Sequence, residues 1–138
     1  MTVFFRVDVA ASVFAILAGS YHLSVFAGWI GSVPVGALDL FWRLGWSVAA
    51  VVVLTVLFAI GVAAFERDGP ARDEREVQLE FRATRNMGMV YAFGLITLLW
   101  NAFRLADPMQ LAHAVIAILV LAELVRLGSL AVYLRRTI

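Results

Sequence analysis

A carboxylate and a guanidinium lie within one apolar stretch near the end of the chain, at Glu123 and Arg126. On a helix, residues three apart are separated by one turn and about 60°, so the two side chains can pair. Charged groups in lipid are costly and need a partner or a task. The pattern predicts a Glu123–Arg126 ion pair that fixes helix packing. The functional alternative is a proton- or cation-binding role for Glu123.

Two histidines, His22 and His113, also lie in apolar stretches. His22 shares a helix face with the small residues Ala15 and Gly19, so we expect it to face the other helices and to hydrogen-bond there. Two histidines raise the possibility of haem. However, a rise of 1.5 Å per residue places His113 some 9 Å closer than His22 to the outer surface. This difference in depth argues against haem bound through His22 or His113, and against a metal site that adds Glu123.

A polar stripe marks a third apolar stretch, where four residues share a sector about 80° wide. These residues are Gly94, Thr97, Asn101 and Arg104. We expect hydrogen bonds between helices, with Arg104 extending to the membrane surface. The functional alternative is the wall of a water-accessible cleft, open to the outside, that attracts anions.

The elements that carry these residues are predicted to be membrane-spanning helices. Apolar residues make up 63% of the 138 residues and charged residues 15%, against roughly 45–50% and 25% in soluble domains. A spanning helix needs about 20 apolar residues. Four stretches qualify, at about 7–30, 41–65, 84–105 and 111–134. We therefore predict an all-α, single-domain protein, a four-helix transmembrane bundle in up-down-up-down order.

The joins between the spans carry helix-ending and helix-starting residues. Asp39 is placed to cap the second span, and Asp107 is predicted to cap the fourth span, with Pro108 at its first position. The first join contains several residues that break helices: Gly31, Ser32, Pro34 and Gly36.

Arginine placement predicts the orientation. Eight arginines lie on one side: Arg6, Arg67, Arg72, Arg75, Arg82, Arg85, Arg135 and Arg136. Only Arg43 and Arg104 lie on the other side, which carries all four tryptophans, Trp29, Trp42, Trp46 and Trp100, as an interfacial belt. Both termini and the charged segment 66–85 are therefore expected in the cytoplasm of a bacterial cell, with the chain crossing the inner membrane several times.

The charged segment is predicted to be the helical beginning of the third span. Acidic residues come early in it and arginines late, which suits the helix dipole. Val77 and Phe81, four residues apart, form a small apolar stripe that could dock on the bundle or on a partner. Contacts with lipid phosphates are expected from Arg82, Arg85, Arg135 and Arg136.

Several function classes are excluded or lack support. The chain has no cysteine, which excludes disulfides, thiol chemistry and zinc–thiolate sites. The net charge of +1 gives no case for nucleic acid. No serine or histidine lies in a nucleophile motif, and no catalytic set is evident, so we expect no enzyme and no cofactor.

Two stretches of the second half carry a resemblance to known proteins. One is Arg72-Asp73-Glu74-Arg75-Glu76, entering a helix; the other runs from Ala122-Glu123 to Tyr133-Leu134-Arg135-Arg136. In these the chain resembles small bacterial membrane proteins of unknown function, of the DUF2178-like type. The resemblance implies a membrane protein and carries no activity.

The leading hypothesis for function is a non-enzymatic membrane interaction or accessory subunit. It would associate with another membrane protein or with itself. The alternative is a small transporter or channel that uses Glu123 as an intramembrane carboxylate, with Asn101 and Arg104 lining its outer vestibule. A haem- or lipid-binding membrane protein is the third class.

Overall fold

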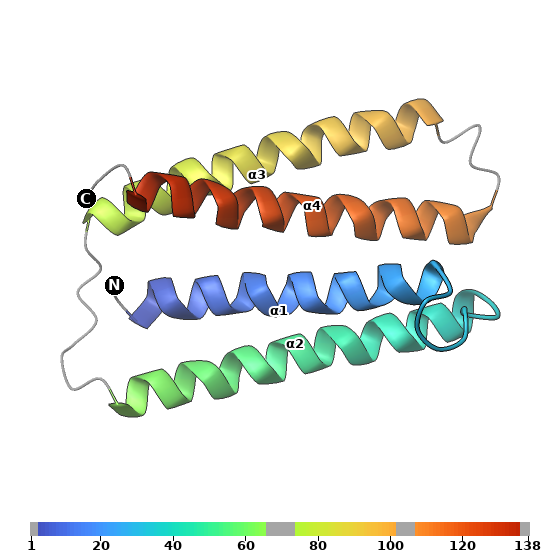
Figure 1. Ribbon diagram of the computed structural model, residues 1–138, viewed down its shortest axis with the longest axis horizontal. Helices are drawn as coiled ribbons and strands as arrows, with labels where there is room; N and C mark the ends of the chain where they lie inside the picture. Colours follow the sequence, from blue (N-terminus) through green and yellow to red (C-terminus); the bar gives the residue numbers. More distant parts are fainter. Residues whose placement is uncertain (1–2, 66–73, 102–106, 136–138) are drawn as a thin grey trace.

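The computed structural model describes residues 3–65, 74–101 and 107–135. Helices are the regular secondary structure of these ranges, and there are four of them: α1 (Val3–Phe26), α2 (Ala37–Phe65), α3 (Glu74–Asn101) and α4 (Pro108–Arg135). Each helix runs antiparallel to the one before it, as the up-down-up-down prediction requires (Figure 1). With 24 to 29 residues each, the helices are roughly 36–44 Å long, longer than the ~30 Å apolar layer of a bilayer.

Three helices are long and apolar enough to cross a membrane: Phe5–Phe26, Ala37–Phe65 and Pro108–Arg135. The third predicted span, 84–105, coincides with the apolar half of α3, which follows a charged half within one continuous helix. Positions 102–105 of that prediction, Arg104 included, lie outside the described residues.

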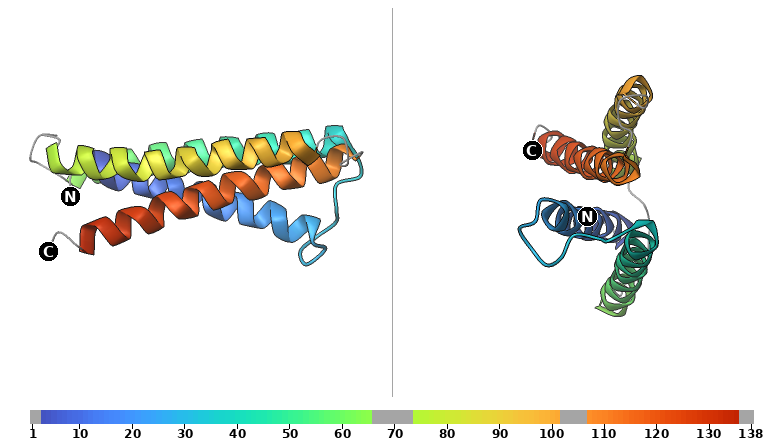
Figure 2. Two further views of the ribbon diagram at one scale, coloured as in Figure 1. Left: turned by 90° about the horizontal axis from the view of Figure 1, so that it is seen from above. Right: turned by 90° about the vertical axis from the view of Figure 1, so that its right-hand side faces the viewer.

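The helices lie in the order α2, α1, α4, α3 across the molecule (Figure 1). Packing joins α1 to α2, α1 to α4 and α3 to α4. Seen end-on in Figure 2, α1 and α4 form the middle, while α2 and α3 lie at opposite edges. The four-helix arrangement is therefore open along one side in the described residues, and each edge helix packs extensively on a single neighbour.

Glycines explain why α4 lies in the middle. A Cβ added to Gly19 of α1 would collide with Val120 of α4, and one added to Gly94 of α3 would lie 2.7 Å from Ile118 Cγ2 of α4. Small residues let helix backbones approach closely in lipid. The predicted ridge of small residues on the first span is thus confirmed at Gly19.

The helix ends differ from the predicted boundaries of the first two spans in three places. α1 begins at Val3 rather than at residue 7. α1 ends at Phe26 rather than at residue 30, because Gly28 has a φ of +73° and the amides of Gly28 and Trp29 bond back to Val25 and Ser24. This is a Schellman cap, which was not predicted from the sequence. α2 starts at Ala37, earlier than predicted, so Asp39 lies in the first turn and accepts the Val35 amide from there.

The start of α4 is confirmed. Asp107 Oδ1 accepts the Met109 amide at 3.0 Å, its carbonyl accepts the Leu111 amide at 3.2 Å, and Pro108 is the first helical residue. An N-cap side chain accepts a hydrogen bond from an amide that has no partner within the helix. Proline at the first position sacrifices no hydrogen bond, because an N–H there would have no partner within the helix.

At the end of the molecule where α3 begins, an apolar cluster ties three helices together. Phe5 of α1, Leu79 and Ala83 of α3, and Leu130 of α4 are each at most 6% exposed. The predicted stripe of Val77 and Phe81 faces away, since these side chains are 40% and 70% exposed. Docking of that stripe on the bundle is therefore wrong, and its docking on a partner stays a prediction.

The four tryptophans lie at the opposite end. Trp29 follows α1, Trp42 and Trp46 lie in the first part of α2, and Trp100 is next to the last residue of α3. The end of α1, the start of α2 and the end of α3 are at the same end of the molecule (Figure 1). Their exposed fractions run from 59% to 81%. This clustering is what an interfacial aromatic belt requires.

Candidate functional site

The ion pair that joins the two middle helices is formed by Arg126 of α4 and Asp8 of α1. The guanidinium Nη2 donates to Asp8 Oδ2, and Nη1 donates to the hydroxyl of Ser12. Arg126 is 7% exposed and Ser12 is 3% exposed. Asp8 and Ser12 are four residues apart and therefore share one face of α1. That face is the one on which the small residues allow α4 to approach.

Glu123 lies beside this pair on α4. Its Oε2 is 3.6 Å from Arg126 Nη1, within ion-pair range, yet this buried oxygen accepts no hydrogen bond from the described residues. Arg126 therefore uses its hydrogen bonds on α1, while the predicted Glu123–Arg126 pair is the looser contact. With all three groups ionised, two carboxylates face one guanidinium, and the cluster carries one surplus negative charge.

The surplus carboxylate lines a groove. The groove has a volume of about 270 Å³ and is formed by all four helices, with α1 contributing from Ala15 to His22 and α4 from Ile116 to Glu123. α2 contributes from Leu44 to Val52, and α3 contributes Tyr91. Most of the lining residues are apolar. The polar ones are Glu123, His22, Ser47 and Tyr91. Asp8 and Arg126 lie outside it.

His22 points to α2, as its predicted position on the inner face requires. Its Nε2 is 2.7 Å from Ser47 Oγ, and the residue is 3% exposed. The Ser47 hydroxyl donates its proton to the Arg43 carbonyl at 3.0 Å. Ser47 Oγ must therefore act as the acceptor, and His22 Nε2 carries the hydrogen that it donates. The predicted neighbour of His22 is thus a serine on the adjacent helix.

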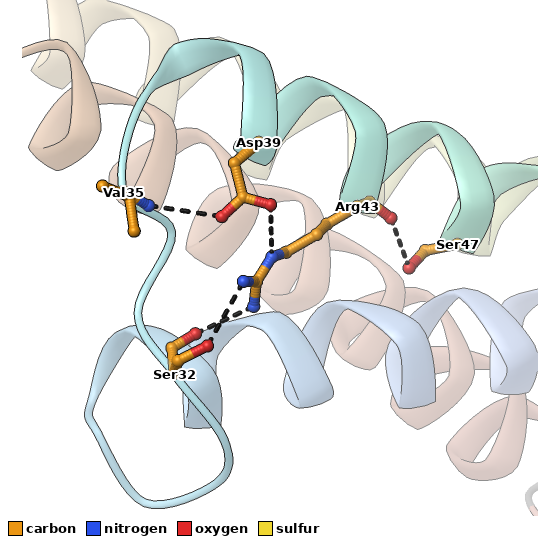
Figure 3. A network of polar contacts seen from close by, with 5 residues as sticks. All are labelled: Ser32, Val35, Asp39, Arg43 and Ser47. Carbon is orange, nitrogen blue, oxygen red and sulfur yellow. Dashed lines mark hydrogen bonds and ion pairs between the residues drawn. The ribbon is translucent and has the colours of Figure 1, made fainter.

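A polar network closes the α1–α2 hairpin just beyond this contact (Figure 3). Arg43 Nε donates to Asp39 Oδ1 at 2.9 Å, and Arg43 Nη1 donates to the Ser32 carbonyl at 2.8 Å. The hairpin loop is thereby fastened to the first turns of α2. Ser47 lies one turn further along α2, where its hydroxyl donates to the Arg43 carbonyl.

The structure does not bring the two histidines together. His113 packs edge-on against the Phe26 ring, with ring centroids 5.1 Å apart, and lines a separate cavity of about 340 Å³ near Asp107 and Gln110. His22 lines the groove instead. In the part of the chain that the structure describes, no group of three or more histidines and carboxylates is placed to hold a metal ion.

The predicted polar stripe on α3 does not reach the groove. Thr97 donates to the Phe93 carbonyl at 2.9 Å, and Asn101 donates to the Thr97 carbonyl at 2.8 Å, both within α3. Gly94 is used for packing against α4, and Arg104 lies outside the described residues. The hydrogen bonds between helices that we expected from Thr97 and Asn101 are bonds to their own helix.

The polar contact between α3 and α4 comes from Asn86, which was overlooked. Its Nδ2 donates to Ser129 Oγ at 3.0 Å and to Tyr133 Oη at 3.1 Å. The available signal was a lone amide at the start of the apolar half of α3, since an intramembrane amide needs a partner on another helix.

Of the arginines expected at lipid phosphates, Arg82, Arg85 and Arg135 are exposed, and Arg136 lies outside the described residues.

Comparison with known proteins adds no family. No protein family, no curated protein and no solved structure matches the chain.

Proposed function

We propose that all four helices cross the inner membrane of a bacterium, with both termini and the segment 66–85 in the cytoplasm. The apolar half of α3 lies along α4, a helix apolar enough to span, and Gly94 brings the two backbones together. The tryptophans then form the outer belt. The exposed Arg82, Arg85 and Arg135 then lie at the opposite, cytoplasmic headgroups.

Within the membrane the protein acts without catalysis, as an interaction or accessory subunit that binds another membrane protein or a second copy. The observation that carries this proposal is the edge position of α2. This helix of 29 residues has Leu40 as its single buried residue, and it packs extensively on α1 alone. An edge helix of this kind has a full face available for a neighbour in the membrane.

Site-specific photo-crosslinking in cells tests this role. A photoreactive amino acid at Val53 or Leu57 of α2, which are 54% and 59% exposed, should give one discrete protein adduct. The matched control is Leu124 of the middle helix α4, 49% exposed, which should give mainly lipid adducts. Lipid adducts alone at every position, with a monomeric mass in native mass spectrometry, would contradict the role.

A second candidate is a small transporter with Glu123 as its coupling carboxylate. The supporting observation is Glu123 itself, which lines a groove formed by all four helices and has an oxygen that accepts no hydrogen bond from the described residues. Proton flux into proteoliposomes, lost in Glu123→Gln and kept in Glu74→Gln, is the expected result. Equal flux from both variants and from empty liposomes contradicts it.

A further inference from the structure

The groove carries one carboxylate, Glu123, whose nearest cation in the described residues, Arg126, is 3.6 Å from Oε2 and lies outside the groove. Arg126 is held on the α1 side by Asp8 and Ser12, and it does not line the groove. Glu123 Oε2 is buried and accepts no hydrogen bond within the described residues, and Glu123 lines the groove among mainly aliphatic residues. An ionised carboxylate in such surroundings is stabilised strongly by any positive charge that reaches it.

The remaining polar groups of the groove do not supply that charge. His22 uses its Nε2 hydrogen on Ser47, whose own hydrogen is donated to the Arg43 carbonyl. Tyr91 is an aromatic residue of the lining, and aromatic rings attract cations. The lining thus combines an apolar wall, one carboxylate and the aromatic side chain of Tyr91.

We propose that this groove binds a small lipophilic cation, whose positive group pairs with Glu123 and whose apolar body lies between α2 and the α1–α4 pair. The inference names a ligand class for the site of the second candidate function. It requires binding only, so it can hold even if nothing is transported.

Dimensions favour a small molecule over a helix of another protein. The lining covers Ala15 to His22 on α1 and Leu44 to Val52 on α2, which is roughly 10–12 Å along the helix axes. A spanning helix would need a groove of about 30 Å. The volume of about 270 Å³ is close to the lower end of the ~300–1,000 Å³ range of small-molecule sites.

Depth also excludes a phospholipid headgroup as the source of the charge. Glu123 is 15 residues from the start of α4 and 12 from its end, and so about 18–22 Å from either. Headgroups lie at the membrane surfaces, outside the apolar layer of about 30 Å. The ligand must therefore carry its charge into the bilayer, as weakly hydrated quaternary ammonium ions do.

The test compares two probes of the same shape, phenyltrimethylammonium and its uncharged carbon analogue tert-butylbenzene. Binding to the purified full chain in micelles is followed by NMR of the labelled methyl groups of Val48, Val52 and Ile116, which line the groove. Glu123→Gln should weaken binding of the ammonium ion about tenfold and leave the hydrocarbon within about twofold. Partitioning of a probe into the micelle does not affect the comparison, because the affinity of each probe is compared between variants of the protein.

Two variants serve as controls. Glu74→Gln removes the same charge at an exposed position outside the groove and should change neither affinity. Val48→Phe, at a lining residue that is 63% exposed, should weaken both probes by filling the space. If Glu123→Gln fails to fold, Val48→Phe decides: unchanged ammonium binding overturns the site.

The proposal is also overturned if Glu123→Gln leaves ammonium binding unchanged, or if it weakens both probes equally. Binding that depends on Glu123 without any proton flux in liposomes retains the site and rejects the transporter. Flux without binding of the ammonium ion retains the transporter and rejects this ligand class.

Discussion

Arg126 of α4 gives its hydrogen bonds to Asp8 of α1, 118 positions earlier in the chain, rather than to Glu123 three positions away. The carboxylate that is nearer in the sequence, Glu123, has its Oε2 3.6 Å from Arg126 Nη1. The Asp8–Arg126 pair joins the two middle helices, α1 and α4. Glu123, the second carboxylate, lines the groove, and its Oε2 accepts no hydrogen bond from the described residues. The stability of the helix pair and the chemistry of the groove therefore depend on the same guanidinium.

Close packing at Gly19 should make this position intolerant of a single added carbon. Gly19→Ala is expected to lower the free energy of unfolding by about 1–3 kcal/mol, because the new Cβ collides with the branched side chain of Val120. Reversible unfolding in mixed micelles measures the loss.

Gly128→Ala is the matched control, since a Cβ there meets nothing within 4 Å. It should be neutral or stabilise by up to ~1 kcal/mol through helix propensity. Equal stability of the two variants would show that α1 does not approach α4 at Gly19.

The Asn86 contact should matter more than the Asn101 contact. Asn86→Ala removes hydrogen bonds from α3 to Ser129 and Tyr133 of α4 and should cost about 0.6–1.7 kcal/mol, the range measured for such bonds in membranes. Asn101→Ala removes a bond within α3 and should cost less. The same unfolding assay compares them, and a larger loss at Asn101 would contradict the packing of α3 on α4.

The orientation can be tested with single cysteines, because the chain has none of its own. Val35→Cys, in the loop between α1 and α2, should react in intact cells with a reagent that cannot cross the membrane. Gln78→Cys, in the charged half of α3, should react only after permeabilisation. The reverse pattern would invert the proposed topology.

The sequence was sufficient for the helices and for residues whose role is local. Asp107 caps α4, Gly19 lies on a small-residue face, and His22 points inward, each because helical phase and capping chemistry act within one or two turns. These features need no knowledge of which helices are neighbours.

The pairing of helices was beyond a single sequence. Asp8 lies near the start of the first span, and neither Asp8 nor Ser12 was singled out from the sequence. Their role depends on α4 packing against α1, a contact between residues more than 100 positions apart. Local spacing favoured Glu123 as the partner of Arg126, whereas the hydrogen bonds follow the tertiary contact.

Two double-mutant cycles, run side by side, test the central claim that Arg126 belongs to Asp8. One combines Asp8→Asn with Arg126→Gln, and the other combines Glu123→Gln with Arg126→Gln, with unfolding free energies measured in the same micelles. We expect a coupling of about 1–3 kcal/mol for Asp8–Arg126, because the Asp8 side chain is 30% exposed and solvent screens the pair, and a smaller coupling for Glu123–Arg126. A larger coupling for Glu123–Arg126 would contradict the Asp8–Arg126 pairing, since it would leave no surplus carboxylate for the groove.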